Sequence, residues 1–156
     1  MKKIGLIGCG NIAETYFRSQ EYFNNIQFIS CADVYEAAAI NCAKENNIKA
    51  QSVDELLFNP EVEVVLNLTI PQAHYEVTKK TLLAGKHSYC EKPLSITFDQ
   101  GKELVELAKK NNLYLGNAPD TFLGGGGQLS RKFLDEEEIG EITLGNFIFA
   151  FPGVET

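Results

Sequence analysis

The sequence predicts an α/β fold built on a doubly wound parallel sheet, and three observations point to it. Short apolar runs that suit buried strands alternate along the chain with stretches of helical periodicity. The first apolar run ends in a glycine-rich segment, Gly8 to Ala13, where a helical pattern begins. The second ends in an acid, Asp33, roughly 20 residues after that segment ends. Repeated strand–helix–strand order implies parallel strands with helices on both faces, as in a Rossmann-type sheet.

The elements follow one another in a regular order. Each predicted strand is a short run rich in apolar residues, and the predicted helices carry apolar residues three or four positions apart. In helix 97–111, Phe98, Val105 and Ala108 share one face, opposite Glu106. In chain order we predict strand 3–7, helix 11–22, strand 27–32, helix 35–46, a short helix 53–58, strand 62–68, helix 72–84, strand 87–90, helix 97–111 and strand 114–116.

The glycine-rich segment has the G-x-G-x-x-A form of the dinucleotide fingerprint. Gly8 permits a tight turn out of the strand, and Gly10 leaves room for a pyrophosphate against the backbone. Ala13 is small enough for the following helix to pack closely on the strand. The free N–H groups at a helix start, with the positive end of its dipole, suit a phosphate. The alternative is a plain strand-to-helix connection without a ligand.

Asp33 stands where the dinucleotide fold places the acid that binds the adenosine ribose. A carboxylate there accepts hydrogen bonds from ribose hydroxyls and repels a 2′-phosphate. It therefore favours NAD over NADP. The alternative is that Asp33 is a helix N-cap or a turn residue before Val34-Tyr35-Glu36.

Composition excludes several function classes. A chain of 156 residues has the size of one domain, and its net charge of −7 argues against a nucleic acid or an anionic membrane surface as partner. No apolar stretch approaches the roughly 20 residues of a membrane span, and the N-terminus reads as a core strand, so we expect a cytoplasmic protein. The four cysteines, Cys9, Cys31, Cys42 and Cys90, fit no zinc template. We interpret them as buried reduced thiols and predict no metal site.

A second constellation, Glu91-Lys92-Pro93, follows strand 87–90 directly. In open α/β sheets, ligands bind at the carboxyl ends of the strands. A lysine there stabilises the alkoxide that develops when a hydroxyl is oxidised, and Glu91 would orient Lys92 or line a cofactor pocket. Pro93 allows a cis bond before it. The alternative is a solvent-exposed Glu–Lys pair before a loop proline.

Together with Leu68-Thr69-Ile70-Pro71 and His74, these motifs resemble, in order and spacing, the glucose-fructose oxidoreductase/inositol dehydrogenase/MocA (Gfo/Idh/MocA) family. The resemblance covers nearly the whole chain. It implies an N-terminal NAD(P)-binding Rossmann domain, and a second α/β domain that binds substrate and makes the oligomer. We interpret the parent protein as an NAD-dependent dehydrogenase of a sugar or polyol. The resemblance implies that Asp33 binds the ribose, that Thr69 lies near the ribose and the pyrophosphate, and that the pyrophosphate is bound by Gly8, Gly10, Asn11 and Ile12. It also implies that Glu91 lies beside the nicotinamide and that Lys92 is the catalytic lysine. For His74 two roles stay open, since it either faces the cofactor or is a turn residue.

The chain changes character near residue 120. We expect the Rossmann domain over residues 1–120, and over 121–156 a crossover helix and the first strand of an otherwise missing substrate domain. The crossover helix follows four glycines, with Leu129, Phe133 and Leu134 on its buried side, and Gly140 ends it. The strand predicted over Glu141–Phe151 is apolar on both faces near its end. An apolar edge strand needs a neighbour to pair with. Either the chain lacks a domain that should follow, or this strand pairs with a second copy of the chain, so we expect a homo-oligomer through this strand.

Two other functions remain open at this point. A non-catalytic dinucleotide-binding module would act through a partner at the C-terminal strand. A methyltransferase would also use a glycine-rich turn and an acid after its second strand, although Glu91-Lys92-Pro93 counts against that class. Without a substrate domain, this chain is expected to bind the dinucleotide but not to complete hydride transfer efficiently.

Overall fold

The computed structural model describes residues 1–119, 121–146 and 148. They fall into two compact units, Met1–Pro119 and Asp120–Thr156, and each is described by itself. Within the described ranges, the helices are all too short or too polar to cross a membrane.

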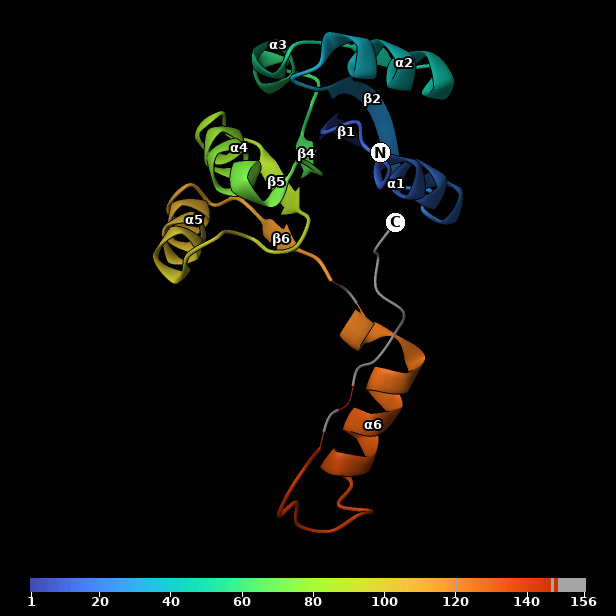
Figure 1. The fold of residues 1–156 in the computed structure, drawn as a ribbon, viewed down its shortest axis with the longest axis vertical. Helices are drawn as coiled ribbons and strands as arrows, with labels where there is room; N and C mark the ends of the chain where they lie inside the picture. Colours follow the sequence, from blue (N-terminus) through green and yellow to red (C-terminus); the bar gives the residue numbers. More distant parts are fainter. Residues whose placement is uncertain (120, 147, 149–156) are drawn as a thin grey trace. The chain divides into compact units, whose positions relative to one another are not determined.

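The first unit is built on a six-stranded parallel sheet with the order β3-β2-β1-β4-β5-β6 (Figure 1). The order reverses between β1 and β4, as in a doubly wound sheet, so the predicted fold class is confirmed. Five strands lie within two residues of their predicted ends. The two-residue edge strand β3 was not predicted, because it has no apolar run to mark it. The strands are β1 (Lys2–Ile7), β2 (Ile26–Ala32), β3 (Lys49–Ala50), β4 (Val64–Asn67), β5 (His87–Cys90) and β6 (Leu115–Asn117).

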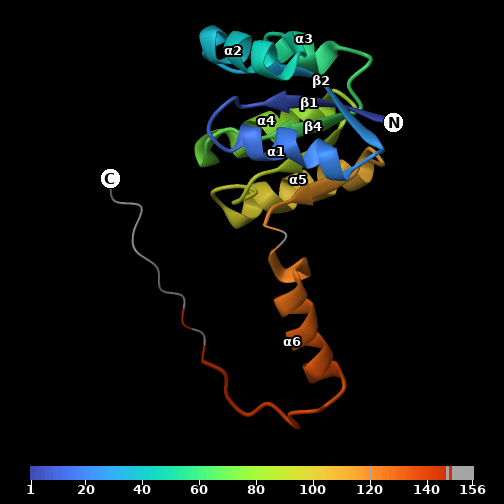
Figure 2. The same ribbon diagram turned by 90° about the vertical axis from the view of Figure 1, so that its right-hand side faces the viewer.

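Helices cover both faces of this sheet. The helices α1 and α2 lie on one face and α3, α4 and α5 on the other (Figures 1 and 2). Adjacent strand residues point to opposite faces, so Leu6 belongs to the apolar cluster under α1 and α2 and Ile7 to the cluster under α3. The helices are α1 (Ala13–Ser19), continued by a 3-10 turn (Gln20–Tyr22), α2 (Glu36–Asn46), α3 (Val53–Phe58), α4 (Pro71–Leu83) and α5 (Phe98–Lys110).

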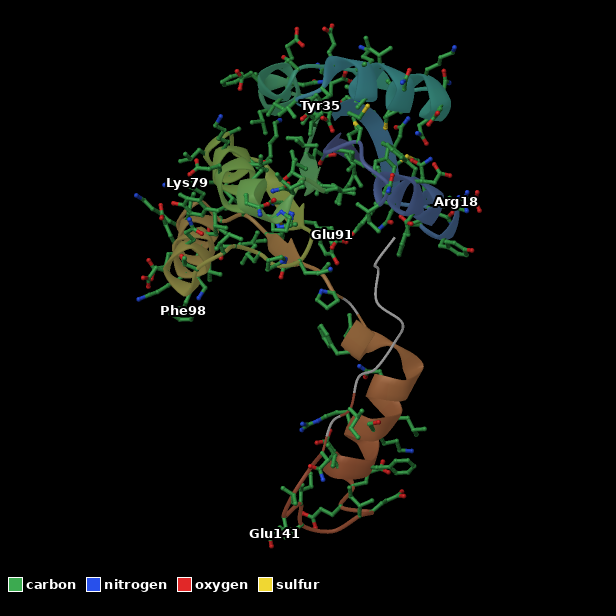
Figure 3. All side chains as sticks on the ribbon, in the orientation of Figure 1. Arg18, Tyr35, Lys79, Glu91, Phe98 and Glu141 are labelled. Atoms are coloured by element: carbon green, nitrogen blue, oxygen red, sulfur yellow. The ribbon has the colours of Figure 1, made fainter. Side chains whose placement is uncertain are left out.

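The buried face of α5 agrees only in part with the one that the helical spacing suggested, because Ala108 is buried as predicted and Phe98 is not. Leu104 is 0% exposed and packs with Ala108 against α4, whereas Phe98 is 84% exposed and points away from the helix (Figure 3). Two neighbouring stripes of α5 are apolar, and spacing alone does not decide which of them packs against α4. The stripe through Phe98 and Val105 instead lines a surface groove with Leu94 and Ile96.

The second unit holds a 3-10 turn (Thr121–Leu123) and α6 (Gly125–Asp135). The helix predicted to run to Gly140 ends at Asp135, and turns continue to Gly140, which has φ +70°. Leu129, Phe133 and Leu134 are exposed rather than buried, because the described part of this unit offers no sheet for them to cover. Residues 141–146 and 148 carry no strand, and residues 147 and 149–151 of the predicted C-terminal strand lie outside the described residues.

Candidate functional site

Three loops that carry predicted site residues meet at the carboxyl edge of the sheet. They follow β1, β4 and β5, which are neighbours in the strand order. The strand order reverses at β1 and β4, so the first two loops flank the crevice where open α/β sheets bind ligands. The fold therefore brings the glycine-rich segment and the Glu91-Lys92-Pro93 segment to one edge.

The two glycines of the first loop have different physical roles. Gly8 has φ +102°, and a Cβ there would lie 2.6 Å from the Leu68 carbonyl oxygen, so the loops after β1 and β4 touch through their backbones. A Cβ on Gly10, in contrast, would meet no heavy atom of the described residues within 4 Å. The N–H groups of Asn11 and Ile12 donate to no acceptor in the described part of the chain. This loop thus offers open space beside unpaired donors.

Asp33 follows β2 directly and lies beside the glycine-rich loop. Its Oδ2 accepts the N–H of Cys9 at 2.8 Å, and its Oδ1 accepts the N–H of Tyr35 at 2.9 Å. The N-cap of α2 is Tyr35, so Asp33 is not the cap, although its bond to Tyr35 is a turn contact. Each oxygen has a further lone pair, because a carboxylate accepts about four hydrogen bonds in all. The half-buried carboxylate is therefore held in place and still able to accept.

A hollow of about 430 Å³ opens beside Asp33, between α2 and the loop after β3. Its described lining includes the carboxylates of Asp33, Glu36 and Glu55 and no lysine or arginine. The backbone and hydroxyl of Ser52 donate to Glu55 and lower the pKa of its carboxyl. This side of the site consequently carries negative charge.

Asn67, at the end of β4, organises the second loop. Its buried side chain donates from Nδ2 to the His74 carbonyl oxygen and to Thr78 Oγ1, each at 3.0 Å. Its Oδ1 accepts the N–H of Thr69 at 3.2 Å and the Thr69 hydroxyl at 2.6 Å. The hydroxyl of Thr69 therefore already donates its proton to a hydrogen bond within the protein. The sequence analysis missed Asn67, whose only signal was a polar residue inside an apolar run.

His74 lies beneath the second and third loops. It is 1% exposed, with Nε2 2.8 Å from the Thr69 carbonyl oxygen and Nδ1 2.5 Å from the Pro93 carbonyl oxygen. Both neighbours are acceptors, so a neutral ring donates to one of them and a doubly protonated ring to both. The structure therefore gives His74 internal contacts that join two loops, and its ring does not lie on the surface.

The third loop is tied to α1. Glu91 Oε1 accepts the hydroxyl of Tyr16 at 2.6 Å, and Oε2 accepts the N–H of Lys92 at 3.0 Å; Figure 3 labels Glu91 at this edge. Asn117 Nδ2 donates to the Cys90 and Glu91 carbonyl oxygens. Lys92 is exposed, and within the described ranges its amine pairs with no acidic side chain. The Lys92–Pro93 bond is cis. Sequence reasoning missed Tyr16, which had no signal beyond its place on a helix.

Comparison with known proteins adds independent observations. The model of an oxidoreductase family with an NAD-binding Rossmann fold, GFO_IDH_MocA, matches residues 2–118. The chain is 32% identical to the 1,5-anhydro-D-fructose reductase of Ensifer adhaerens over 118 residues, covering 74% of this chain and 35% of that protein. It is 29% identical to an inositol 2-dehydrogenase/D-chiro-inositol 3-dehydrogenase of Lactiplantibacillus plantarum, covering 69% of this chain and 32% of that protein.

Among solved structures, the biliverdin reductase of Synechocystis in complex with biliverdin and NADP⁺ is similar, with a TM-score of 0.75 and 30% identity. The alignment covers 85% of this chain and 42% of that one. The chain spans about a third of the length of the two curated relatives named above.

Proposed function

The chain belongs to the Gfo/Idh/MocA family of oxidoreductases with an NAD-binding Rossmann fold, and we propose that it is the dinucleotide-binding part of an NAD-dependent sugar or polyol dehydrogenase. The observation that carries this proposal is the open backbone of the glycine-rich loop. Unpaired N–H groups and empty space at Gly10 lie at the same sheet edge as Asp33 and Lys92. The names of the reductase and the inositol dehydrogenase among its relatives support the substrate class.

We assign the pyrophosphate to the space at Gly10, where the N–H groups of Asn11 and Ile12 are free to donate to its oxygens. Gly8 contributes to pyrophosphate binding indirectly, because its lack of a side chain lets the glycine-rich loop pass close to the backbone of Leu68. Asp33 accepts from the adenosine ribose hydroxyls. Thr69 Oγ1 already donates to Asn67, so toward a ribose hydroxyl it acts as an acceptor.

The charge beside Asp33 favours NAD over NADP. A 2′-phosphate would add about 1.5 to 2 negative charges next to three carboxylates, those of Asp33, Glu36 and Glu55. No cation lines the hollow within the described residues to offset that repulsion. The similar biliverdin reductase was solved with NADP⁺, so this preference is a property to be measured on the present chain.

Lys92 is the residue that we propose for catalysis. The bound dinucleotide supplies the hydride acceptor or donor. The exposed Lys92 ammonium is free to donate a hydrogen bond to a substrate hydroxyl oxygen. When the hydroxyl proton passes to solvent water, the positive charge of Lys92 stabilises the alkoxide that develops. Glu91, fixed by Tyr16 and the Lys92 N–H, holds this loop beside α1. His74 acts as a positioning residue beneath the loops rather than as a cofactor ligand.

Gly10→Ala is expected to weaken NAD⁺ binding by about 100-fold, or roughly 2.7 kcal/mol, because the new methyl group takes the space proposed for the pyrophosphate. Stability should change by less than about 0.5 kcal/mol, since that methyl meets no described protein atom. Calorimetric titration with NAD⁺ and with NADP⁺ measures both the loss and the preference, which we expect to favour NAD⁺ at least about tenfold.

The matched control is Gly126→Ala, a second glycine whose added Cβ would meet nothing within 4 Å and which lies in α6. It should bind NAD⁺ as the unmodified chain does. Unchanged NAD⁺ affinity in Gly10→Ala would remove the pyrophosphate assignment. Tight binding of S-adenosylmethionine in place of either dinucleotide would favour the methyltransferase alternative.

Lys92→Ala, in a protein that carries this chain together with a substrate domain, is expected to lower kcat by about 100- to 1,000-fold, the usual range for loss of one group that stabilises a developing oxyanion. NAD⁺ affinity should be nearly unchanged. The measurement is NADH formation with a panel of sugars and polyols, and Lys109→Ala, an exposed lysine on α5, is the control. Equal turnover by Lys92→Ala and the unmodified protein would contradict the catalytic assignment. NAD⁺ binding without any turnover would favour the binding-module alternative.

A further inference from the structure

Three of the four cysteines converge in space, although their spacing in the sequence matches no metal-binding template. Cys9 comes from the loop after β1, Cys31 from β2 and Cys42 from α2. Their Sγ atoms all lie within 4.8 Å of one another. Figure 3 shows yellow sulfur atoms gathered beside β2 and α2. Cys31 and Cys42 are buried, and Cys9 is half-buried.

The separations of these sulfur atoms are close to those of a three-thiolate metal site. With metal–sulfur bonds of about 2.3 Å, three sulfur atoms around one ion lie on the order of 4 Å apart. A small contraction from the observed arrangement is therefore enough. The present partners of the thiols are weak, because Cys9 Sγ lies 3.5 Å from the Ala32 carbonyl oxygen and Cys31 Sγ 3.4 Å from that of Ala39.

We propose that Cys9, Cys31 and Cys42 form a binding site for one soft, thiophilic metal ion, of the class that includes copper(I) and cadmium(II). The group contains three sulfur ligands, and the described residues add no fourth His, Asp or Glu to it. Soft thiolate ligands select soft ions, while magnesium and calcium require oxygen ligands. A three-ligand set also suits zinc less well than a softer ion, since structural zinc is almost always four-coordinate.

Thiols bind metal ions as thiolates. An ion that enters this cluster therefore releases protons from the sulfur atoms to solvent, and that release can be measured.

Solvent reaches the cluster through a groove of about 860 Å³ between α1 and α2. Cys9 and Cys42 both line this groove, together with Gly10 and Asn11 of the glycine-rich loop. An ion has a route to the sulfur atoms that does not require the sheet to open. Because Cys9 stands between Gly8 and Gly10, a bound ion would also fix that loop, but the site itself does not depend on the proposed dinucleotide function.

The test is a titration of the reduced chain with CdCl₂ under anaerobic conditions, followed by the ultraviolet charge-transfer band of cadmium–thiolate bonds. One equivalent of Cd²⁺ per chain is expected to bind, with release of protons to the buffer. Cys9→Ser and Cys42→Ser should each weaken Cd²⁺ binding by about 100-fold or more, because each removes a direct ligand. A large excess of Mg²⁺ should not compete.

Cys90→Ser is the matched control, since Cys90 is buried, has a pKa raised to about 11 by burial, and lies outside the cluster. It should bind Cd²⁺ as the unmodified chain does. Circular dichroism shows whether each variant folds. If the variant of the buried Cys42 fails to fold, the variant of the half-buried Cys9 is used for the test. The site is ruled out if the unmodified chain gives no band at one equivalent, if the band survives in a folded Cys9→Ser, or if it is lost in a folded Cys90→Ser.

Discussion

Gly8→Ala is expected to destabilise the first unit by about 3 kcal/mol or more. The backbone of Gly8 has φ +102°, which costs a residue with a Cβ on the order of 1 to 3 kcal/mol. The added Cβ would also lie 2.6 Å from the Leu68 carbonyl oxygen and 2.7 Å from the Thr69 nitrogen. Urea unfolding measures the effect as a lower midpoint at an unchanged slope.

Neither backbone at this contact is free to retreat. The N–H of Gly8 donates to the Ala32 carbonyl oxygen at 2.9 Å, and the N–H of Leu68 donates to the Ile7 carbonyl oxygen at 2.8 Å. Relief of the clash therefore costs pairing between β1 and its neighbours. Gly10→Ala is the control, because it adds the same methyl group two residues away in open space. If the two variants unfold at the same urea concentration, the inferred backbone contact between the loops after β1 and β4 is contradicted.

His74→Ala is expected to lower the free energy of unfolding by about 2 to 4 kcal/mol, the range for a buried side chain whose loss leaves a cavity and unpaired polar groups. The ring nitrogens lie beside the carbonyl oxygens of Thr69 and Pro93, so the substitution removes every hydrogen bond that the ring donates to them. NAD⁺ affinity should fall as well, because these carbonyls belong to the two loops at the proposed site. The measurements are urea unfolding and calorimetric titration with NAD⁺.

His74→Phe separates the volume of the ring from its hydrogen bonds, since it fills most of the space but donates nothing. It should recover part of the stability and little of the NAD⁺ affinity. The comparison variant is His87→Phe, at the start of β5, whose ring accepts a single hydrogen bond from the Tyr114 N–H. Its loss should cost only about 1 kcal/mol. NAD⁺ affinity that is unchanged in both His74 variants would contradict the positioning role.

Local patterns were sufficient for most of the elements. Strand His87–Cys90 and helix Val53–Phe58 begin and end at their predicted residues, because periodicity and the flanking breakers act over a few residues. The two-residue strand β3 was not predicted from the sequence, because Lys49 and Ala50 pair with β2 without belonging to an apolar run. The buried stripe of α5 was chosen by packing against α4, which its own spacing does not encode.

Sequence patterns alone were enough to predict the fold class, the family, and the segments that supply the proposed site. Gly8, Asp33 and Lys92 stand in positions that local turn chemistry and parallel strand order make interpretable. Those signals act between near neighbours, where sterics and the helical or strand repeat constrain each residue directly.

The contacts between residues far apart in the sequence are visible only in the folded structure. Tyr16 reaches Glu91 across 75 positions, and His74 joins the two loops after β4 and β5. The three converging thiols come from a loop, a strand and a helix. Such contacts depend on the order and register in which the strands pair and on how each helix turns on the sheet. Those are properties of the whole packed unit, and no short stretch of sequence carries them.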